Sequence, residues 1–210
     1  MSWKTAIAAV VAVAAVVVAV VLIADFGDDD SAEASETDGA FMAEMTAHHE
    51  AAIEMAEMAQ ERGERAEVKG LAEEIIAAQS GEIERFSSIH DQMFGEPMSS
   101  ADHGTLGMSA SEMGMEMNMS ELESAQPFDQ AFIDAMVAHH QGAIRMARVE
   151  LEQGEDDELA EIAEAIIAAQ SAEIEQMNAW RQQWYGAPSP AGGAPSEGET
   201  EAPSHEMMGH

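Results

Sequence analysis

The sequence predicts an all-α protein, a four-helix bundle made of two tandem αα-hairpins and preceded by one N-terminal transmembrane helix. Helix-forming Ala, Glu, Met and Ile are abundant, while aromatic residues make up only 5% of the 210 residues. Hydrophobic residues recur at steps of three and four, as on one helical face. Residues 41–95 and 132–186 align without a gap, and 26 of the 55 paired positions are identical. We therefore expect two copies of one helical unit.

Composition excludes several classes of function. The chain has 41 acidic residues against 8 Lys and Arg, a formal net charge of -33. Nucleic acid is therefore not an expected partner, because phosphate binding needs clustered basic residues. The absence of cysteine excludes disulfides, thiolate zinc sites and cysteine nucleophiles. With 17 Met and 8 His, the composition favours soft-metal chemistry instead.

The first element, residues 1–24, reads as a signal anchor or transmembrane helix. Thr5 to Ala24 holds no charge, and twenty helical residues span the roughly 30 Å hydrocarbon core of a bilayer. Lys4 precedes this stretch and acidic residues follow it, which predicts a single-pass protein of the cell membrane with the bulk of the chain outside the cytoplasm. The alternative is a cleaved signal peptide that leaves a secreted or periplasmic protein.

The next element, residues 25–40, carries seven acids and no base, and we expect it to be a solvated tether. The bundle then spans 41–186. In its first unit the apolar face of the first helix ends near Gly63, and a second helical pattern runs from about Ala66 to Phe94.

The second unit repeats this organisation, with helical patterns over 128–153 and 157–185 that turn at Gly154. Two segments lie outside the helical patterns. The linker, 96–126, is rich in Met, and the tail, 187–210, is rich in Pro and Glu, is expected to be disordered and ends in a His/Met cluster.

The motif that points to chemistry is Met-x-x-His-His, present once in each unit with a further Met two turns beyond it. On a helix these side chains share a face, so imidazole nitrogen and thioether sulfur can converge on one point. Methionine sulfur is soft and selects copper, Cu(I) in preference to Cu(II), although core packing is the alternative role for each Met. The predicted metal ligands are Met45, His48, His49, Met55, Met136, His139, His140 and Met146.

Two further sets of residues are candidates around that motif. Antiparallel pairing within each hairpin brings an amide and a carboxylate of the second helix level with the histidines, either as hard ligands or, as we prefer, as acceptors that fix the imidazole tautomer. These residues are Gln79, Glu82, Gln170 and Glu173. The linker places four thioethers at every second position, which would lie on one side of an extended chain and predict weaker copper sites. They are Met113, Met115, Met117 and Met119.

These residues carry a resemblance to a known family. Phe41-Met42-x-x-Met45-x-x-His48-His49-x-x-Ala52-Ile53-x-Met55-Ala56 and Phe132-Ile133-x-x-Met136-x-x-His139-His140-x-x-Ala143-Ile144-x-Met146-Ala147 are similar to the bacterial family catalogued as domain of unknown function number 305, which includes CopM-type copper-binding proteins. The resemblance covers about 41–186. It implies a ferritin-like four-helix bundle, an exported location and a part in copper binding or tolerance.

The sequence therefore predicts an exported, membrane-tethered protein that binds copper ions for sequestration or tolerance, without turnover. The sequence does not identify the copper-handling protein that would be its partner. One alternative is a metal-dependent oxidoreductase of ferritin-like type, but the repeated Glu-x-x-His pair that such di-iron sites use is absent, because Met45 and Met136 stand three residues before His48 and His139. Another alternative is an acidic module whose histidines sense pH, which leaves the Met run unexplained.

Overall fold

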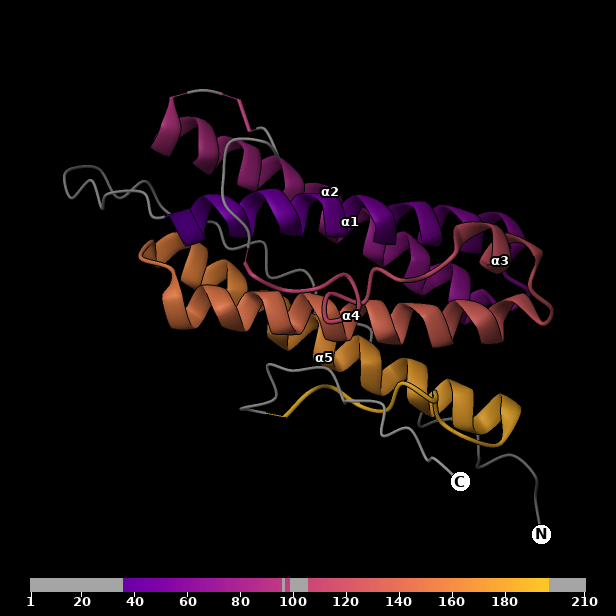
Figure 1. Cartoon of the computed structure of the whole chain (residues 1–210). Coiled ribbons are helices and arrows are strands. Elements are labelled where there is room, and N and C mark those ends of the chain that lie inside the picture. Colours follow the sequence, from indigo (N-terminus) through magenta and orange to yellow (C-terminus); the bar gives the residue numbers. More distant parts are fainter. Residues whose placement is uncertain (1–35, 96, 99–105, 197–210) are drawn as a thin grey trace, which may run out of the picture. The chain divides into compact units, whose positions relative to one another are not determined.

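The structure, a computed structural model, describes residues 36–95, 97–98 and 106–196, and it is all-α within those ranges (Figure 1). The predicted all-α class is confirmed there. The helices are α1 Glu36–Arg62, α2 Ala66–Phe94, α3 Met119–Ser124, α4 Phe128–Gln153 and α5 Asp157–Tyr185. The predicted anchor at 1–24 lies outside the described residues. Among the helices that the structure describes, none has the length and apolarity needed to cross a membrane.

Four long helices form two antiparallel hairpins, α1 with α2 and α4 with α5, as the sequence predicts. The hairpins meet chiefly through α1 and α4, so these two helices form the inner pair (Figure 1). The inner helices are antiparallel, because the start of α1 contacts the residues after α4 while the start of α4 contacts the residues after α1. Residues in the middle of α1 therefore face residues in the middle of α4.

Reciprocal capping fixes this crossing at both ends. Both carboxylate oxygens of buried Asp129, at the start of α4, accept hydrogen bonds from the backbone N–H groups of Glu64 and Arg65, at 2.8 and 3.1 Å. Asp38, at the start of α1, accepts from the two residues at the equivalent positions before α5, at 3.0 and 3.4 Å. The first helix of each hairpin thus satisfies backbone donors at the start of the other hairpin's second helix.

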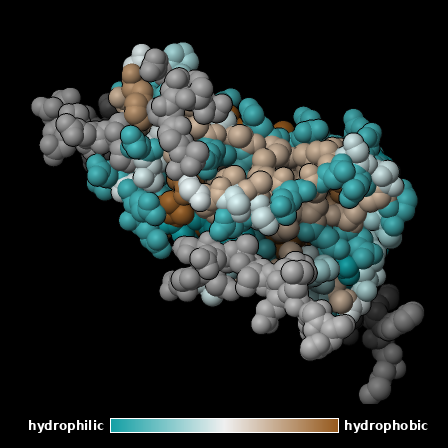
Figure 2. Space-filling view, in the orientation of Figure 1, coloured by the Kyte–Doolittle hydropathy of each residue, from teal (hydrophilic) through white to brown (hydrophobic). Residues whose placement is uncertain are grey.

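The apolar core consists of two clusters, and methionine contributes to both. One cluster contains Met55, Met136 and Met177, together with Phe128 and Phe132. The other contains Met42, Met45 and Met146 with Phe41 and Phe86, among other residues. Unbranched thioether side chains fill irregular gaps between helices, which accounts for part of the high Met content. In the viewed face of the molecule, hydrophilic residues cover much of the surface and a band of mildly hydrophobic residues lies between them (Figure 2).

The prediction of a solvated tether over 25–40 is wrong for its last residues. α1 begins at Glu36, and Asp38, Gly39 and Ala40 are buried. The acidic composition suggested solvation, but one of these acids is the interior cap just described. The remainder of that segment lies outside the described residues.

The described part of the linker, chiefly 106–126, is more ordered than its composition predicts. Asn118 begins the short helix α3 by accepting hydrogen bonds from the N–H groups of Ser120 and Glu121, and Leu122 of that helix is buried. An Asn followed three residues later by Glu is a capping signal that sequence reasoning passed over. The four linker methionines also do not lie in one extended segment, because Met113 lies in a turn.

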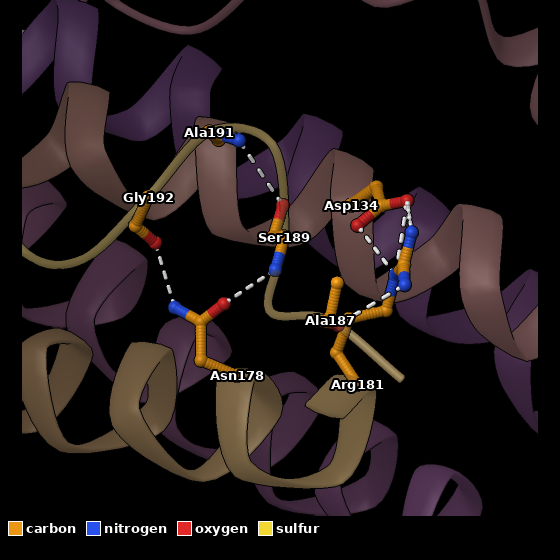
Figure 3. A network of polar contacts seen from close by, with 7 residues as sticks. All are labelled: Asp134, Asn178, Arg181, Ala187, Ser189, Ala191 and Gly192. Atoms are coloured by element: carbon orange, nitrogen blue, oxygen red, sulfur yellow. Dashed lines mark hydrogen bonds and ion pairs between the residues drawn. The ribbon is translucent and has the colours of Figure 1, made fainter. Parts of the chain in front are cut away.

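The tail prediction, disorder over 187–210, is wrong for residues 187–196, which fold back over α4 and α5. Asn178 of α5 accepts a hydrogen bond from the N–H of Ser189 at 2.7 Å and donates to the carbonyl of Gly192 at 2.6 Å (Figure 3). Side-chain amides thus satisfy backbone groups that no regular element pairs, which is how an irregular segment is held in place.

Arginine residues hold the same segment at its two ends. Arg181 pairs with Asp134 of α4 at 3.1 Å and donates to the carbonyl of Ala187 (Figure 3). Arg148 donates to the carbonyls of Pro195 and Ser196, both at 2.7 Å. A composition count cannot reveal these bonds, because their acceptors are backbone carbonyls.

Candidate metal centre

The two inner histidines meet where α1 crosses α4. The imidazole rings of His48 and His139 have centroids 3.6 Å apart and planes inclined by 32°, and both residues are about 1% exposed. His49 and His140, their neighbours in sequence, are completely buried, with ring centroids 6.4 and 6.5 Å from those of His48 and His139. The crossing therefore gathers all four predicted histidines into one buried row.

The outer histidines each face a carboxylate of their own hairpin. His49 Nε2 lies 2.7 Å from Glu82 Oε2, and His140 Nε2 lies 2.6 Å from Glu173 Oε2. The His140–Glu173 contact is a hydrogen bond in which the carboxylate accepts, so Nε2 of His140 carries the proton. Nε2 of His49 lies close to its carboxylate but has no hydrogen-bond partner among the described residues. Both Nδ1 atoms are buried without a hydrogen-bond partner among the described residues.

The predicted amides behave differently from the carboxylates. Gln79 and Gln170 are buried as the register suggests, but their Oε1 atoms have no hydrogen-bond partner in the part of the chain that the structure describes. The carboxylates of the two glutamates therefore lie against the outer imidazoles, while the amide oxygens of the two glutamines stay unpaired there.

The inner histidines differ from each other. His48 Nε2 lies 2.9 Å from the backbone carbonyl oxygen of Met113 in the linker. A carbonyl only accepts, so His48 carries its proton on Nε2 and its Nδ1 is buried without a partner within the described residues. Neither ring nitrogen of His139 has a hydrogen-bond partner there. Buried polar atoms are normally paired, so this group of imidazole nitrogens needs an explanation.

Burial keeps the inner pair uncharged. Burial, followed by the neighbouring charge of His49, lowers the pKa of His48 to about 3, with the Met113 carbonyl acting in the opposite direction. Burial, then the charge of His48, lowers the pKa of His139 well below its ordinary value. Both rings are therefore neutral near pH 7, the form in which imidazole binds metals.

The four predicted methionine ligands are divided between the two apolar clusters. Met45 and Met146 belong to one apolar cluster, and Met55 and Met136 belong to the other. Each cluster thus receives one of these thioethers from each hairpin, and all four residues are fully buried. Because these side chains are packed among apolar residues, a metal ion could reach their sulfur atoms only inside the core.

The four linker methionines do not form a single row. All of them are half-buried. Met113 packs against the cluster that contains Met45, whereas Met117 and Met119 pack against the cluster that contains Met55. Within the described ranges, no group of three or more His or carboxylate side chains is arranged to hold a metal ion. The potential donors that the fold brings near one another are the four imidazoles.

Sequence reasoning missed the backbone group that reaches the centre, the carbonyl of Met113. One signal was present in the sequence: Gly142 of α4 stands where the first unit has Ala51, and it leaves room for the linker. The repeat aligns His90 with Arg181, which favours a surface position, but His90 is buried and its ring lies 4.6 Å from that of Phe94. It belongs to α2, outside the histidine row.

The chain is similar to a protein family and to several solved structures. A family described as Domain of unknown function (DUF305) matches residues 38–181 and 129–210. The structure of CopM in the Cu(I)-bound form is 38% identical, with a TM-score of 0.60, over 70% of this chain and 97% of that one. CopM in the Cu(II)-bound form is 39% identical, with a TM-score of 0.63 over the same shares.

A more distant structure has the same fold. A DUF305 fragment from Deinococcus radiodurans is 24% identical, with a TM-score of 0.63, over 72% of this chain and 99% of that one. Among curated proteins, none matches the chain.

Proposed function

We propose that this chain, which belongs to the DUF305 family, binds copper, chiefly as Cu(I), at the histidine row between α1 and α4, and that it sequesters copper or confers tolerance to it. One observation carries the proposal. Two hairpins bury four imidazoles side by side, and none of the four Nδ1 atoms has a hydrogen-bond partner among the described residues. A cluster of buried, unpaired ring nitrogens costs stability, and a bound metal ion would satisfy it.

The uncharged inner pair of the row favours the monovalent ion. The inner imidazoles at the crossing are buried and neutral, and the predicted methionine ligands carry no charge. Transfer of an ion into a poorly solvated interior is costlier for a double charge than for a single charge. Thioether ligands are soft and add a further preference for Cu(I). CopM itself has been solved with Cu(I) and with Cu(II), so the Cu(II) form stays part of the proposal.

The stacked arrangement of the inner rings has a consequence for binding. The lone pair of a ring nitrogen lies in the plane of the ring, and the planes of His48 and His139 are inclined by only 32°. One ion that takes both rings as ligands therefore requires at least one ring to rotate out of the stack. We expect the ultraviolet and NMR signals of both rings to change together when copper binds.

The location of the protein is a separate proposal that rests on sequence. We propose that residues 1–24 anchor the chain in the cell membrane and that the bundle lies outside the cytoplasm, where a partner protein would receive or supply copper. Fractionation of cells that express the full chain tests it. Recovery of a shorter chain in the soluble fraction would instead support cleavage of the segment.

Copper binding is tested by competition of the full chain against a Cu(I)-specific chelator under reducing conditions. We expect the double variant His48→Ala, His139→Ala to lose the tightest Cu(I) site. His90→Ala, which removes a buried histidine outside the row, is the matched control and keeps it. Circular dichroism checks that helicity persists in each variant. Unchanged Cu(I) affinity in a folded double variant would refute the proposed site.

A further inference from the structure

The linker segment Ser109–Met115 packs backbone to backbone on α4. A methyl group at Gly142 would lie 1.8 Å from the carbonyl oxygen of Met113, and one at Gly114 would lie 2.4 Å from the carbonyl oxygen of Ala138. Both distances are far inside van der Waals contact. Gly114 also has φ +69°, a conformation that favours glycine. The close approach therefore requires glycine on both surfaces.

Hydrogen bonds give this segment, which we term the linker loop, a defined shape. The N–H of Met113 donates to the carbonyl of Ser109 at 3.0 Å, and the N–H of Met115 donates to that of Ala110 at 2.8 Å. The carboxylate of Glu112 accepts from the N–H and hydroxyl of Ser109, both at 2.6 Å. The loop is held by its own bonds before any contact with α4 is counted.

One side chain of α4 then attaches the loop to the helix. Arg145, which is 7% exposed, donates from Nη1 to the carbonyl of Glu112 at 3.0 Å. Gly142 lies one turn before Arg145 on the same face. Together they fix the next carbonyl along the chain, that of Met113, which accepts from His48 of α1 at 2.9 Å. The loop thus connects α4 to the histidine of the opposite hairpin.

We propose that the linker loop positions the metal ligand His48: the Met113 carbonyl holds the ring in the tautomer with the proton on Nε2, so that Nδ1 is the atom that binds the metal. This inference rests on the proposed function and specifies its ligand atom. It also separates the two inner histidines, because no described residue is a hydrogen-bond partner of the His139 ring nitrogens. His139 is then the ring that we expect to reorient when the metal binds.

A loop that merely covers the core would not determine the tautomer. The readout is therefore the ¹⁵N chemical shifts of the His48 ring in the copper-free full chain at one fixed pH. We expect the wild-type ring to be a single species protonated on Nε2. Gly142→Ala displaces the Met113 carbonyl, so we expect a mixture of tautomers and a Cu(I) affinity lower by about 10- to 100-fold.

The matched control is Gly81→Ala. Gly81 is also a helical glycine, but a methyl group there meets nothing within 4 Å, so both the tautomer and the Cu(I) affinity should stay as in the wild type. Arg145→Gln provides a second variant that loosens the loop without adding bulk under it. We expect it to shift the tautomer in the same direction, by a smaller amount.

The outcomes separate this inference from the proposed function. A wild-type His48 protonated on Nδ1, or an unchanged tautomer in both loop variants, overturns the inference. If the loop variants shift the tautomer while the double variant His48→Ala, His139→Ala still binds Cu(I) like the wild type, the loop orients the ring but the proposed copper site is wrong.

Discussion

The imidazole rings of His48 and His139 stack with centroids 3.6 Å apart, although 91 residues of chain separate them. Neither ring makes an ion pair with a described carboxylate, in contrast to His49 and His140. Two neutral, partly unpaired rings in a protein interior stabilise it less than two apolar side chains of similar size would. Their presence is better explained by binding than by stability.

This leads to a prediction for His139→Leu. The change removes two ring nitrogens that have no partner among the described residues, so we expect the free energy of unfolding to stay equal or to rise by up to about 1 kcal/mol. Chemical denaturation of the metal-free protein measures it. A decrease of more than about 2 kcal/mol would assign His139 a packing role instead. The same variant should bind Cu(I) more weakly.

The outer carboxylates predict a graded effect. Glu173 Oε2 lies 2.6 Å from His140 Nε2 and orients that ring. Glu173→Leu removes the acceptor, and we expect the Cu(I) affinity to fall by about 10- to 100-fold. Glu173→Gln keeps a carbonyl oxygen that can accept, so its loss should be smaller. Chelator competition compares the two variants, and equal losses would mean that the charge, and not the hydrogen bond, is what matters.

A buried acid in α4 predicts a pH dependence of stability. Burial, followed by the hydrogen bond and charge of Asp38 and the charge of Asp156, raises the pKa of Glu150 from 4.5 to about 8. Between these values the folded chain keeps a proton that the unfolded chain releases. The proton on Glu150 therefore stabilises the folded chain fully below pH 4.5. This stabilisation is lost as the pH rises to and through about 8, by at most about 1.4 kcal/mol per pH unit.

Glu150→Gln stays uncharged at every pH and should flatten this part of the stability curve. Denaturation between about pH 5 and pH 9 measures the slope. Glu152→Gln, an exposed neighbour on the same helix, is the control and should leave the slope as it is. A wild-type slope that persists in Glu150→Gln would assign the pH dependence to another group.

The reciprocal caps predict a loss of stability in Asp129→Ala. The change leaves the N–H groups of Glu64 and Arg65 without their acceptor and removes the pair that Asp129 makes with the Arg65 side chain. We expect a decrease of about 1 to 2 kcal/mol in the free energy of unfolding. Glu57→Ala, at an exposed position of α1, should change it by less than about 0.5 kcal/mol. Similar losses in the two variants would contradict the capping role.

Much of the helical architecture was predictable because its signals are local. Periodic apolar residues and the glycines at 63, 95, 154 and 186 place the four long helices within a few residues of their observed ends. The register of each hairpin follows from its short turn, which is why Glu82 and Glu173 were expected near the histidines. The order of the tail and linker was not predictable, because side-chain bonds to backbone carbonyls, such as that of Gln141 to Ala191, leave no compositional trace.

The sequence by itself determined the helices, the faces that carry histidine and methionine, and the donor chemistry of those faces, since each depends on residues within a few turns of one another. Only the tertiary structure decided that His48 meets His139 across the antiparallel crossing and that the Met113 carbonyl reaches His48. The physical reason is that these contacts join groups 65 or more positions apart, one of them a backbone atom that every residue possesses. Packing of the two hairpins, and the space left at Gly142, select which of those groups touch.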